Sequence, residues 1–354
     1  MTSVDWLADG GCEEVVIVRD RAAGAVAVVA VHDTRLGPAH GGIRRWRYPE
    51  LGAAIGDAVQ LARAMTWKCA LADVPAGGGK AVILDRPDLD RAAAYRLVGR
   101  TVERLGGRFF TGPDVGTTVA DLRVVRGETR FVATGEPEAG DPGPGDLGLW
   151  TATGVAAALG ALADRLGVPG AGLRVAVQGL GAVGMRLCEL LHAAGVRLVV
   201  ADVDAELTAA AAARFGAEVA AVERIANVPC DVFAPCALGG VLTAAVARTL
   251  PARGVCGAAN NVFADAAAAR ILRERGVLVV PDFVANAGAL IAGALWHLRG
   301  RSVGAERIRR IAATAGDILD RARAADLPPH EIALRLAEER VARGADAAID
   351  EGDD

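Results

Sequence analysis

Lysine is almost absent from this sequence, and the two lysines that remain lie close together. Among 39 Lys and Arg residues, only Lys68 and Lys80 are lysines, and Lys80 follows three glycines in the segment PAGGGKAVIL. A GC-rich genome would explain the excess of arginine but not the positions of the two lysines. Arginine stays protonated in proteins, whereas a buried lysine with a lowered pKa can donate or accept a proton. The pattern therefore predicts a site that needs a small cation or a titrating amine.

A glycine motif in the second half of the chain indicates a cofactor. The segment VAVQGLGAVG places Gly179, Gly181 and Gly184 in G-x-G-x-x-G order after a predicted strand and before a predicted helix. These glycines would allow a tight turn and a close approach of the backbone to a pyrophosphate at the helix N-terminus. Asp202 ends the next predicted strand, where its carboxylate can bind the ribose hydroxyls and would repel a 2′-phosphate. The motif predicts a dinucleotide site for NAD rather than NADP.

The predicted cofactor suggests which reaction would need the lysines. A nicotinamide moves hydride, and hydride transfer at a carbon that bears nitrogen or oxygen needs accompanying proton transfer. A lysine with a lowered pKa and a carboxylate suit that task. The segment TGPDVGTT places Asp114 at the tip of a glycine-flanked loop. Lys80 and Asp114 are therefore the candidate catalytic residues.

The elements that would position these residues fall into two groups. In the first half, residues 25–33 and 81–85 are predicted strands, and Leu51 to Met65 follow a helical period that ends near Lys68. A segment rich in Pro, Gly and acidic residues, 135–148, follows without periodicity. After it, short β-rich runs alternate with Ala-rich helical stretches, which is typical of a parallel, doubly wound sheet. We predict an α/β protein of two domains.

Composition narrows the class of protein. The 354 residues carry a net charge of −4, which gives no basis for nucleic-acid binding. No apolar run is expected to reach the length of a membrane span, because charges or Gly and Pro interrupt each one. The N-terminus shows no signal-peptide pattern. The six cysteines form no CxxC pair and are interpreted as free thiols of a reducing cytoplasm. The five histidines show no metal-ligand spacing, so no metal is expected.

Seven segments together are similar to one enzyme family. The chain resembles the glutamate/leucine/phenylalanine/valine dehydrogenases, most closely the phenylalanine and leucine dehydrogenase branch, over nearly its whole length. The resemblance implies an enzyme that oxidatively deaminates an L-amino acid with NAD and, in reverse, aminates a 2-oxo acid with ammonia. The segments are LGPAHGGIR (36–44), LARAMTWKCALADVPAGGGKAVI (61–83), TGPDVGTT (111–118), VAVQGLGAVG (175–184), CDVFAPCALGG (230–240), GAANN (257–261) and PDFVANAG (281–288).

The resemblance also implies an arrangement of domains. Residues 1–134 would form the domain for substrate binding, catalysis and oligomerisation. Residues 135–324 would form a Rossmann-type NAD-binding domain, separated from the first by a cleft. The C-terminal helices, at about 325–354, would pack back on the first domain. A homo-oligomer is implied, without its number of subunits.

The resemblance assigns roles to individual residues. Lys68 would bind the substrate carboxylate, Lys80 would polarise the 2-oxo group and handle the water and carbinolamine protons, and Asp114 would carry the proton of ammonia. A Schiff base on Lys80 is the chemical rival. Either Asn260 or Asn261 would help to hold the carboxylate. The other implied contacts are Gly41, Gly42, His40, Met65, Gly112, Leu290 and Gly293 with the substrate, and Gly179, Gly181, Ala182, Val183, Gly184, Asp202, Val203, Thr153, Ala237 and Asn286 with the cofactor.

The predicted pocket departs from the family at several positions. His40 stands where the glutamate enzymes carry Lys and the leucine and phenylalanine enzymes carry a small or apolar residue. It would hydrogen-bond a polar or aromatic side chain of the substrate, or it would simply pack against the pocket wall or turn outward. Gly112 and Gly293 leave room for a large side chain, so a phenylalanine-like substrate is expected. A branched-chain amino acid, an unusual polar or aromatic one, and a catalytically idle NAD-binding sensor are the alternatives.

Overall fold

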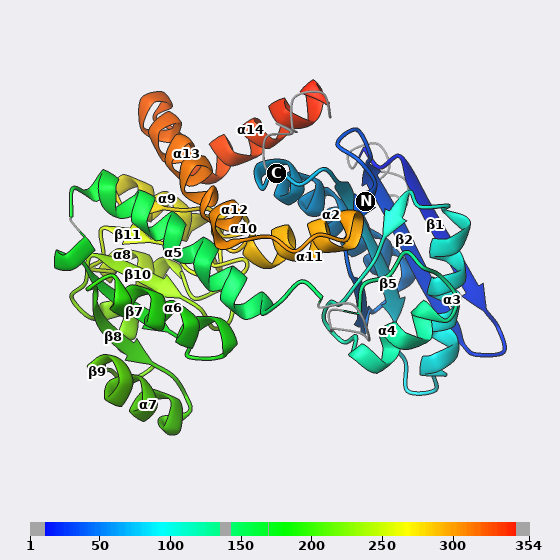
Figure 1. The fold of residues 1–354 in the computed structure, drawn as a ribbon, viewed down its shortest axis with the longest axis horizontal. Coiled ribbons are helices and arrows are strands. Elements are labelled where there is room, and N and C mark those ends of the chain that lie inside the picture. The colour runs from blue at the N-terminus through cyan, green and yellow to red at the C-terminus, as the bar shows by residue number, and fades with distance from the viewer. Residues whose placement is uncertain (1–10, 135–142, 169, 345–354) are drawn as a thin grey trace. The chain divides into compact units, whose positions relative to one another are not determined.

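A computed structural model describes residues 11–134, 143–168 and 170–344 of the chain (Figure 1). The described residues divide into two compact units. Unit 1 takes in 11–134, 143–145, 293–302 and 337–344, and unit 2 takes in 146–168, 170–292 and 303–336. The predicted domain limits of 1–134 and 135–324 stay a prediction, and part of the predicted linker, 135–142, lies outside the described residues.

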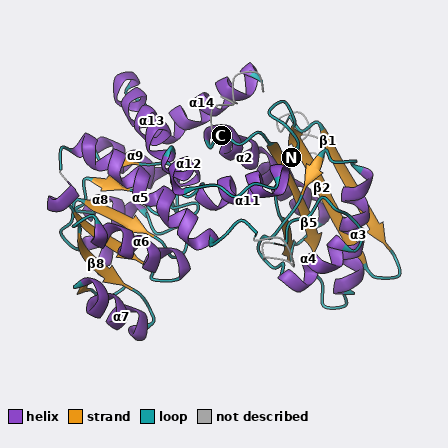
Figure 2. Cartoon of the chain, viewed as in Figure 1, coloured by secondary structure: helices purple, strands orange, loops and turns teal. Residues whose placement is uncertain are grey.

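Unit 1 is built on a six-stranded mixed sheet with the order β1-β2-β5-β3-β6, in which β4 also pairs with β5. β5 runs antiparallel to β2 and parallel to β3 and β4, which makes it the central strand (Figure 2). The strands are β1 (Glu14–Asp20), β2 (Ala25–Asp33), β3 (Ala39–His40), β4 (Ile43–Trp46), β5 (Gly77–Leu84) and β6 (Phe109–Phe110). The helices that lie within this unit are α2 (Leu51–Leu71), α3 (Arg91–Arg104) and α4 (Val119–Arg126).

Unit 2 is built on a six-stranded sheet that is parallel throughout, with the order β12-β11-β10-β7-β8-β9. The chain reverses direction across the sheet between β7 and β10, as it does in dinucleotide-binding folds, where ligands bind at this switch point. This confirms the predicted doubly wound sheet. The strands are β7 (Arg174–Gln178), β8 (Arg197–Ala201), β9 (Glu218–Val219), β10 (Val232–Pro235), β11 (Gly254–Val255) and β12 (Leu278–Val279).

The helices of unit 2 flank its sheet, and two further helices are shared between the units (Figure 2). The α-helices of unit 2 are α5 (Leu147–Leu166), α6 (Ala182–Ala193), α7 (Ala205–Phe215), α8 (Ala244–Thr249), α9 (Ala266–Glu274), α10 (Asp282–Ala285), α12 (Ala305–Arg309) and α13 (Ile311–Ala325), with short 3₁₀ turns at Gly170–Gly172 and Ile225–Asn227. The shared helices are α11 (Gly288–Arg299) and α14 (Pro329–Arg343).

Helix α5 corrects one expectation from the sequence. By length and composition it is apolar enough to cross a membrane, and among the described residues it alone passes that test. It packs against α6 and α13, however, and eleven of its residues are buried. The expectation that no apolar run reaches a spanning length is therefore wrong for this segment, and the burial of α5 makes it a core helix of unit 2.

Each unit has its own hydrophobic core. In unit 1 the alternating residues of β2 bury one set of valines and alanines beneath α3 and another beneath α2. In unit 2 the central strands β7, β8 and β10 are almost entirely buried, as expected for a parallel sheet covered on both faces. Lys80 stands on the central strand β5 of unit 1, and the predicted glycine motif follows the central strand β7 of unit 2.

Candidate active site

The two candidate catalytic residues meet in unit 1. All eight residues of β5 are buried, and Lys80 lies in the middle of this strand with a side chain only 6% exposed. Its Nζ lies 2.8 Å from Oδ2 of Asp114, on the loop that follows β6. Nε of Arg44, on β4, lies 3.1 Å from the same oxygen. The structure thus places two cations around one carboxylate.

Arg44 connects this group to a second carboxylate. Its Nη1 lies 3.2 Å from Oδ2 of Asp57 on α2, and the hydroxyl of Tyr48 donates a hydrogen bond to that same oxygen. Sequence reasoning missed these three residues. Asp57 had a usable signal, because it is the only acidic residue of α2. Arg44 ends the segment LGPAHGGIR, but one arginine among 37 carries no signal by its type.

The surroundings alter the protonation of both catalytic candidates. Burial lowers the pKa of Lys80, because the charged form loses solvation, and the charge of Asp114 offsets only part of that effect. Burial alone would raise the pKa of Asp114, but the charge and hydrogen bond of Lys80, together with Arg44, outweigh it and lower that pKa. The geometry therefore favours an ionised Asp114 beside an amine that loses its proton more easily than an ordinary lysine.

Glycines let the backbone segments of unit 1 come unusually close to one another. A Cβ on Gly41 would lie 1.8 Å from the carbonyl oxygen of Gly79, and a Cβ on Gly42 would lie 2.3 Å from that of Pro113. The backbone amide of Gly41 donates to Phe110, and the carbonyl of Gly42 accepts from the amide of Ala81. A side chain at Gly41 would push away the strand that carries Lys80, and one at Gly42 would push away the loop that carries Asp114.

Helix α2 carries two of the predicted substrate contacts of unit 1, Met65 and Lys68. Met65 lies against the β3–β4 turn, with its Cγ 3.6 Å from the position that a Cβ of Gly41 would take. Lys68 follows three residues later, in the last turn of the helix, so the two residues are neighbours on the same side of α2. Both residues thus come from the helix that packs on β5.

The remaining pocket candidates lie on different elements. His40 ends β3, and Gly112 follows β6, where an added Cβ would make only ordinary contacts with Ala133. Gly293 is on α11 in the part that belongs to unit 1, and a Cβ there would meet nothing within 4 Å. Leu290, three residues earlier and half-buried, belongs to unit 2.

The predicted dinucleotide motif forms the turn from β7 into α6. Gly179 has a φ of +94°, which favours glycine, and a Cβ on Gly184 would lie 1.9 Å from the carbonyl oxygen of Gly179. A Cβ on Gly181 would meet nothing within 4 Å. The first and third glycines thus serve the fold, whereas the second leaves open space at the N-terminus of α6. This is the room that a pyrophosphate needs.

Asp202 is held at the end of β8 beside that turn. Its Oδ2 accepts a hydrogen bond of 2.6 Å from the amide of Leu180, and its Oδ1 accepts one from the amide of Asp204. Ala182 and Val183 form the first turn of α6, and Ala237 lies against Gly179. The side chain of Val203 is 91% exposed. The residues present therefore fit a dinucleotide.

Two further candidates in unit 2 differ in how their polar atoms are used. The hydroxyl of Thr153 donates to the carbonyl of Leu149 one turn earlier in α5. The amide nitrogen of Asn286 donates to Oδ1 of Asn260 over 2.7 Å and to the carbonyl of Ala258. Oδ1 of Asn286 is buried without a partner in the structure. A buried oxygen of this kind normally has a hydrogen-bond donor, so this acceptor fits a ligand amide.

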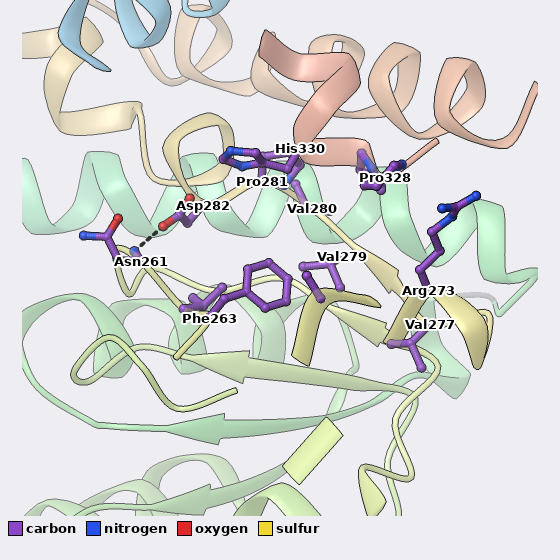
Figure 3. A pocket seen from close by; sticks show the side chains of 13 residues that line it. Asn261, Phe263, Arg273, Val277, Val279, Val280, Pro281, Asp282, Pro328 and His330 are labelled. Carbon is purple, nitrogen blue, oxygen red and sulfur yellow. Dashed lines mark hydrogen bonds between the residues drawn. The ribbon is translucent and has the colours of Figure 1, made fainter. Parts of the chain in front are cut away.

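Asn261 has a special backbone conformation and lines a cavity of about 250 Å³ in unit 2 (Figure 3). Its φ is +53°, and its backbone amide donates to the carboxylate of Asp282 (Figure 3). Apolar side chains such as Phe263 and Val279 form most of the wall. Neither Lys80 nor the glycine turn lines this cavity, and Asn261 is the one predicted site residue on its wall.

Comparison with known proteins places the chain in a family. The Glu/Leu/Phe/Val dehydrogenase dimerisation domain matches residues 13–131, and the Glutamate/Leucine/Phenylalanine/Valine dehydrogenase domain matches residues 202–299. The chain belongs to the glutamate/leucine/phenylalanine/valine dehydrogenase family. Its relatives place it near the leucine dehydrogenase branch, and it is an amino-acid dehydrogenase, an oxidoreductase acting on the CH–NH₂ group.

Three relatives carry different substrate names. Leucine dehydrogenase of Geobacillus stearothermophilus is 39% identical over 93% of this chain and 90% of its own length. Valine dehydrogenase of Streptomyces albus is 41% identical over 94% of this chain and 93% of its own. L-tryptophan dehydrogenase of Nostoc punctiforme is 38% identical over 94% of each chain, and its crystal structure matches 96% of this chain and 98% of its own with a TM-score of 0.87. The family is therefore settled, whereas the relatives name both branched-chain and aromatic substrates.

Proposed function

We propose that the protein catalyses the reversible NAD-dependent oxidative deamination of an L-amino acid with an aromatic side chain to its 2-oxo acid and ammonia. The observation that carries this proposal is the buried pair of Lys80 and Asp114 in unit 1. It supplies one amine with a lowered pKa and one ionised carboxylate, which are the two proton-transferring groups that the reaction needs.

In the proposed mechanism, Lys68 binds the substrate carboxylate as a fixed point charge. The backbone of Gly41 and Gly42 borders the reacting carbon, and either Asn260 or Asn261 supplies a further hydrogen bond to the carboxylate. Asp114 accepts a proton from the substrate ammonium, which leaves the amine neutral. Only the neutral amine can support the loss of hydride from the α-carbon, because its lone pair stabilises the iminium that forms.

Lys80 then handles the water that completes the reaction. As a neutral amine, it accepts a proton from that water while the oxygen bonds to the iminium carbon, which gives a carbinolamine. Asp114 returns its proton to the nitrogen and, as the C–N bond breaks and ammonia leaves, takes up the proton of the carbinolamine hydroxyl, which becomes the 2-oxo group. Lys80, now charged, stabilises the 2-oxo group. Lys80 and Asp114 thus carry all of the transferred protons, and their Nζ and Oδ2 atoms lie 2.8 Å apart.

The cofactor is proposed to be NAD. When bound, it accepts hydride from the substrate. Gly181 leaves room for its pyrophosphate at the start of α6, and Asp202 would bind the ribose hydroxyls and repel a 2′-phosphate. Thr153 and Asn286 are proposed to orient the nicotinamide, since Asn286 keeps an acceptor oxygen without a partner. Ala182, Val183, Val203 and Ala237 would border the dinucleotide.

Two glycines support the aromatic substrate class. An added Cβ at Gly293 would meet nothing within 4 Å, and at Gly112 it would make only ordinary contacts. Neither position has the positive φ that would itself favour glycine. Because the backbone does not require glycine at these two positions, their open space favours a large substrate side chain. A branched-chain substrate is the second candidate, because two of the relatives at about 40% identity are named for leucine and valine.

We also propose a homo-oligomer in the cytoplasm. The part of the family that covers residues 13–131 is described as a dimerisation domain, which supports self-association through unit 1. All six cysteines are free. Free thiols throughout a chain of this size are typical of proteins from reducing compartments.

The test of the proposed function is NADH consumption with ammonium across aromatic and branched-chain 2-oxo acids. We expect the highest kcat/KM with an aromatic acid, and lower activity when NADPH replaces NADH. A preference for a branched-chain acid would reject the aromatic substrate class, but the proposed deamination reaction would stand. Tight NADH binding with no turnover on any 2-oxo acid would reject the reaction itself.

A further inference from the structure

Two buried histidines of unit 1 face each other beside the catalytic lysine. His40 ends β3, and His297 lies near the end of α11, in the part that belongs to unit 1. Their ring centroids lie 5.6 Å apart with the ring planes at 80°. We refer to His40 and His297 as the histidine pair. Sequence reasoning identified His40 but not His297, whose position 257 residues later in the chain gave no sign of this contact.

The histidine pair has unused hydrogen-bonding capacity. All four ring nitrogens are buried, and none has a hydrogen-bond partner in the structure. Buried polar atoms are normally satisfied, so four unsatisfied nitrogens at one place call for a ligand or for water. Both residues retain some accessible surface, so the pair is not sealed inside the core.

The aromatic rings around the histidine pair cannot form hydrogen bonds with its ring nitrogens. The ring of Phe110 contacts that of His297 edge-on at a centroid distance of 5.0 Å, and Phe131 contacts Phe110 in the same manner at 5.2 Å. Phenylalanine offers neither a hydrogen-bond donor nor an acceptor beyond its backbone. These phenylalanines therefore suit contact with an apolar ring of a ligand. The two imidazoles place polar atoms beside this apolar surface.

The position of the pair relative to Lys80 points to the substrate. His40 is paired in register with Gly78 of β5, so it lies on the same side of the sheet as Lys80 two residues further along that strand. The positive charge of Lys80 also acts on His40. His40 is paired in register with Phe110 as well, and Gly112 follows Phe110 by two residues. These residues thus line one side of the sheet next to the catalytic amine.

The space beside His297 is open. Gly293 precedes His297 by four residues on α11, so the two lie on the same helix face, one turn apart. A Cβ on Gly293 would meet nothing within 4 Å. Glycine at this position therefore leaves room next to the imidazole, where a bulky ring can reach its nitrogens.

The charge state of the pair selects the kind of group that it binds. Burial, with the charge of Lys80 as a smaller cause, lowers the pKa of His40 to about 4, and burial, with His40 and Arg126, lowers that of His297 to about 3. Both imidazoles are therefore neutral near pH 7. Each then offers one donor and one acceptor, which suits a neutral hydrogen-bonding group better than a charged one.

We infer that His40 and His297 bind an N–H or O–H group on an aromatic substrate side chain, so that the enzyme prefers indole or phenol side chains to phenyl and branched aliphatic ones. This inference rests on the proposed function. Water can satisfy the nitrogens before substrate binds, but a side chain that displaces this water must replace its hydrogen bonds. Phenyl and branched aliphatic side chains cannot do so, and sites built to bind a polar group reject analogues that lack it.

The experiment compares 2-oxo acids that differ in one polar group. NADH oxidation with ammonium is measured for 4-hydroxyphenylpyruvate against phenylpyruvate, and for indolepyruvate against its naphthyl analogue. We expect kcat/KM to be at least ~10-fold higher for the polar member of at least one couple. In His297→Phe and His40→Leu this ratio should fall towards one, while turnover of the apolar member persists.

Controls separate a lost hydrogen bond from a damaged fold. His297→Gln keeps a donor and an acceptor and should retain part of the preference, which a purely structural role would not predict. His192→Phe is the matched control, because His192 packs on Phe215 in unit 2 and should leave the ratio unchanged. If the wild type turns over the polar and the apolar acid of each couple with nearly equal kcat/KM, the inference is overturned and the proposed function stands. The same holds if the kcat/KM ratio is unchanged in both His297→Phe and His40→Leu. Absence of turnover with every acid would overturn the proposed function and the inference with it.

Discussion

At the scale of single residues, the decisive feature is one carboxylate oxygen shared by two cations. Oδ2 of Asp114 lies 2.8 Å from Nζ of Lys80 and 3.1 Å from Nε of Arg44. Only one of these cations can release its proton, because arginine stays charged in proteins. Lys80 and Arg44 together lower the pKa of Asp114, and Arg44 keeps its charge when Lys80 loses its proton, which burial makes easier.

Replacing the catalytic lysine by arginine tests this division of roles. Lys80→Arg keeps the positive charge but removes the group that titrates, so kcat should fall by at least ~10²-fold. The measurement is steady-state deamination of the preferred amino acid, with NADH binding as a check that unit 2 is intact. Lys68→Arg is the comparison, because a longer forked cation there should raise KM more than it lowers kcat. Near-wild-type kcat in Lys80→Arg would reject the proton-transfer role.

The pH profile of deamination should carry the signature of the lowered lysine pKa. Neutral Lys80 is the active form, so kcat/KM should rise with pH and level off above the pKa of this amine. Because burial lowers that pKa, the inflection should lie below the ordinary lysine value of about 10.5. The charge of Arg44 also lowers it, so Arg44→Gln should move the inflection to higher pH.

The neighbouring arginine supplies the control for this shift. Arg45 pairs with Asp85, its Nη1 lying 2.6 Å from Oδ1, and it is not among the main charges that shift the pKa of Lys80. Arg45→Gln should therefore leave the inflection where the wild type has it. An inflection that stays in place in Arg44→Gln, or one that moves equally in both variants, would contradict the assignment to Lys80.

The sequence identified these residues unevenly, for a physical reason. Lys68 and Lys80 stood out because lysine is rare in this chain, and Asp114 because of its glycine-flanked loop. Arg44 and Asp57 share one network of ion pairs with Lys80 and Asp114. The type of Arg44 gave no signal, whereas Asp57, the only acidic residue of α2, had one that was missed. His297 could not be found, because its contact with His40 depends on how α11 packs, which periodicity does not contain. Residue type predicts chemistry, whereas tertiary packing decides the partners.

At the scale of elements, strand β5 is longer than predicted because it includes three glycines, which have no apolar side chain to mark a strand in the sequence. The apolar pattern predicts a strand at 81–85, but β5 begins at Gly77. A Cβ on Gly78 would lie 2.1 Å from the carbonyl oxygen of Ala62 and 2.2 Å from the amide of Thr66. Helix α2 thus rests directly on the backbone of β5. The glycines extend the strand because only they allow the helix to come so close.

Adding one methyl group should test that contact. Gly78→Ala would push α2 away from β5 and should lower the free energy of unfolding by ~1–3 kcal/mol, the range for overpacked cores. Activity should fall as well, because Met65 and Lys68 are carried by α2. The matched control is Gly56→Ala within the same helix, where an added Cβ meets nothing within 4 Å and should stabilise by ~0.5–1 kcal/mol. Denaturant unfolding gives both values, and a wild-type midpoint for Gly78→Ala would contradict the close packing.

At the scale of the whole molecule, the chain consists of two units with separate cores. Unit 2 was the easier to predict, since its strands alternate with helices and its glycine motif falls on the first turn. Unit 1 was harder, because the two-residue strands β3 and β6 belong to a mixed sheet without the regular strand–helix alternation of unit 2. Local patterns predict long elements well, whereas very short strands exist only through their tertiary pairing.

Separate cores predict that a ligand of one unit need not stabilise the other. The candidate NAD site, from Gly179 to Asp202, lies wholly within unit 2. NADH at 100 times its Kd should therefore stabilise unit 2 by ~2.7 kcal/mol. Hydrogen exchange monitored by mass spectrometry should show slower exchange in β7 and β8 and little change in β5. Equal protection of β5 would mean that the two units unfold as one.

The same exchange measurement with NADPH separates binding of a dinucleotide from the choice of dinucleotide. Both cofactors present a pyrophosphate to the open space at Gly181, but only NADPH brings a 2′-phosphate towards Asp202. Protection by NADPH at equal concentration should therefore be weaker. Asp202→Asn removes the negative charge and keeps an oxygen that can accept the hydrogen bond from Leu180, so it should narrow the difference while the turn stays intact. Equal protection by both cofactors in the wild type would reject the selection for NAD and leave the dinucleotide site itself in place.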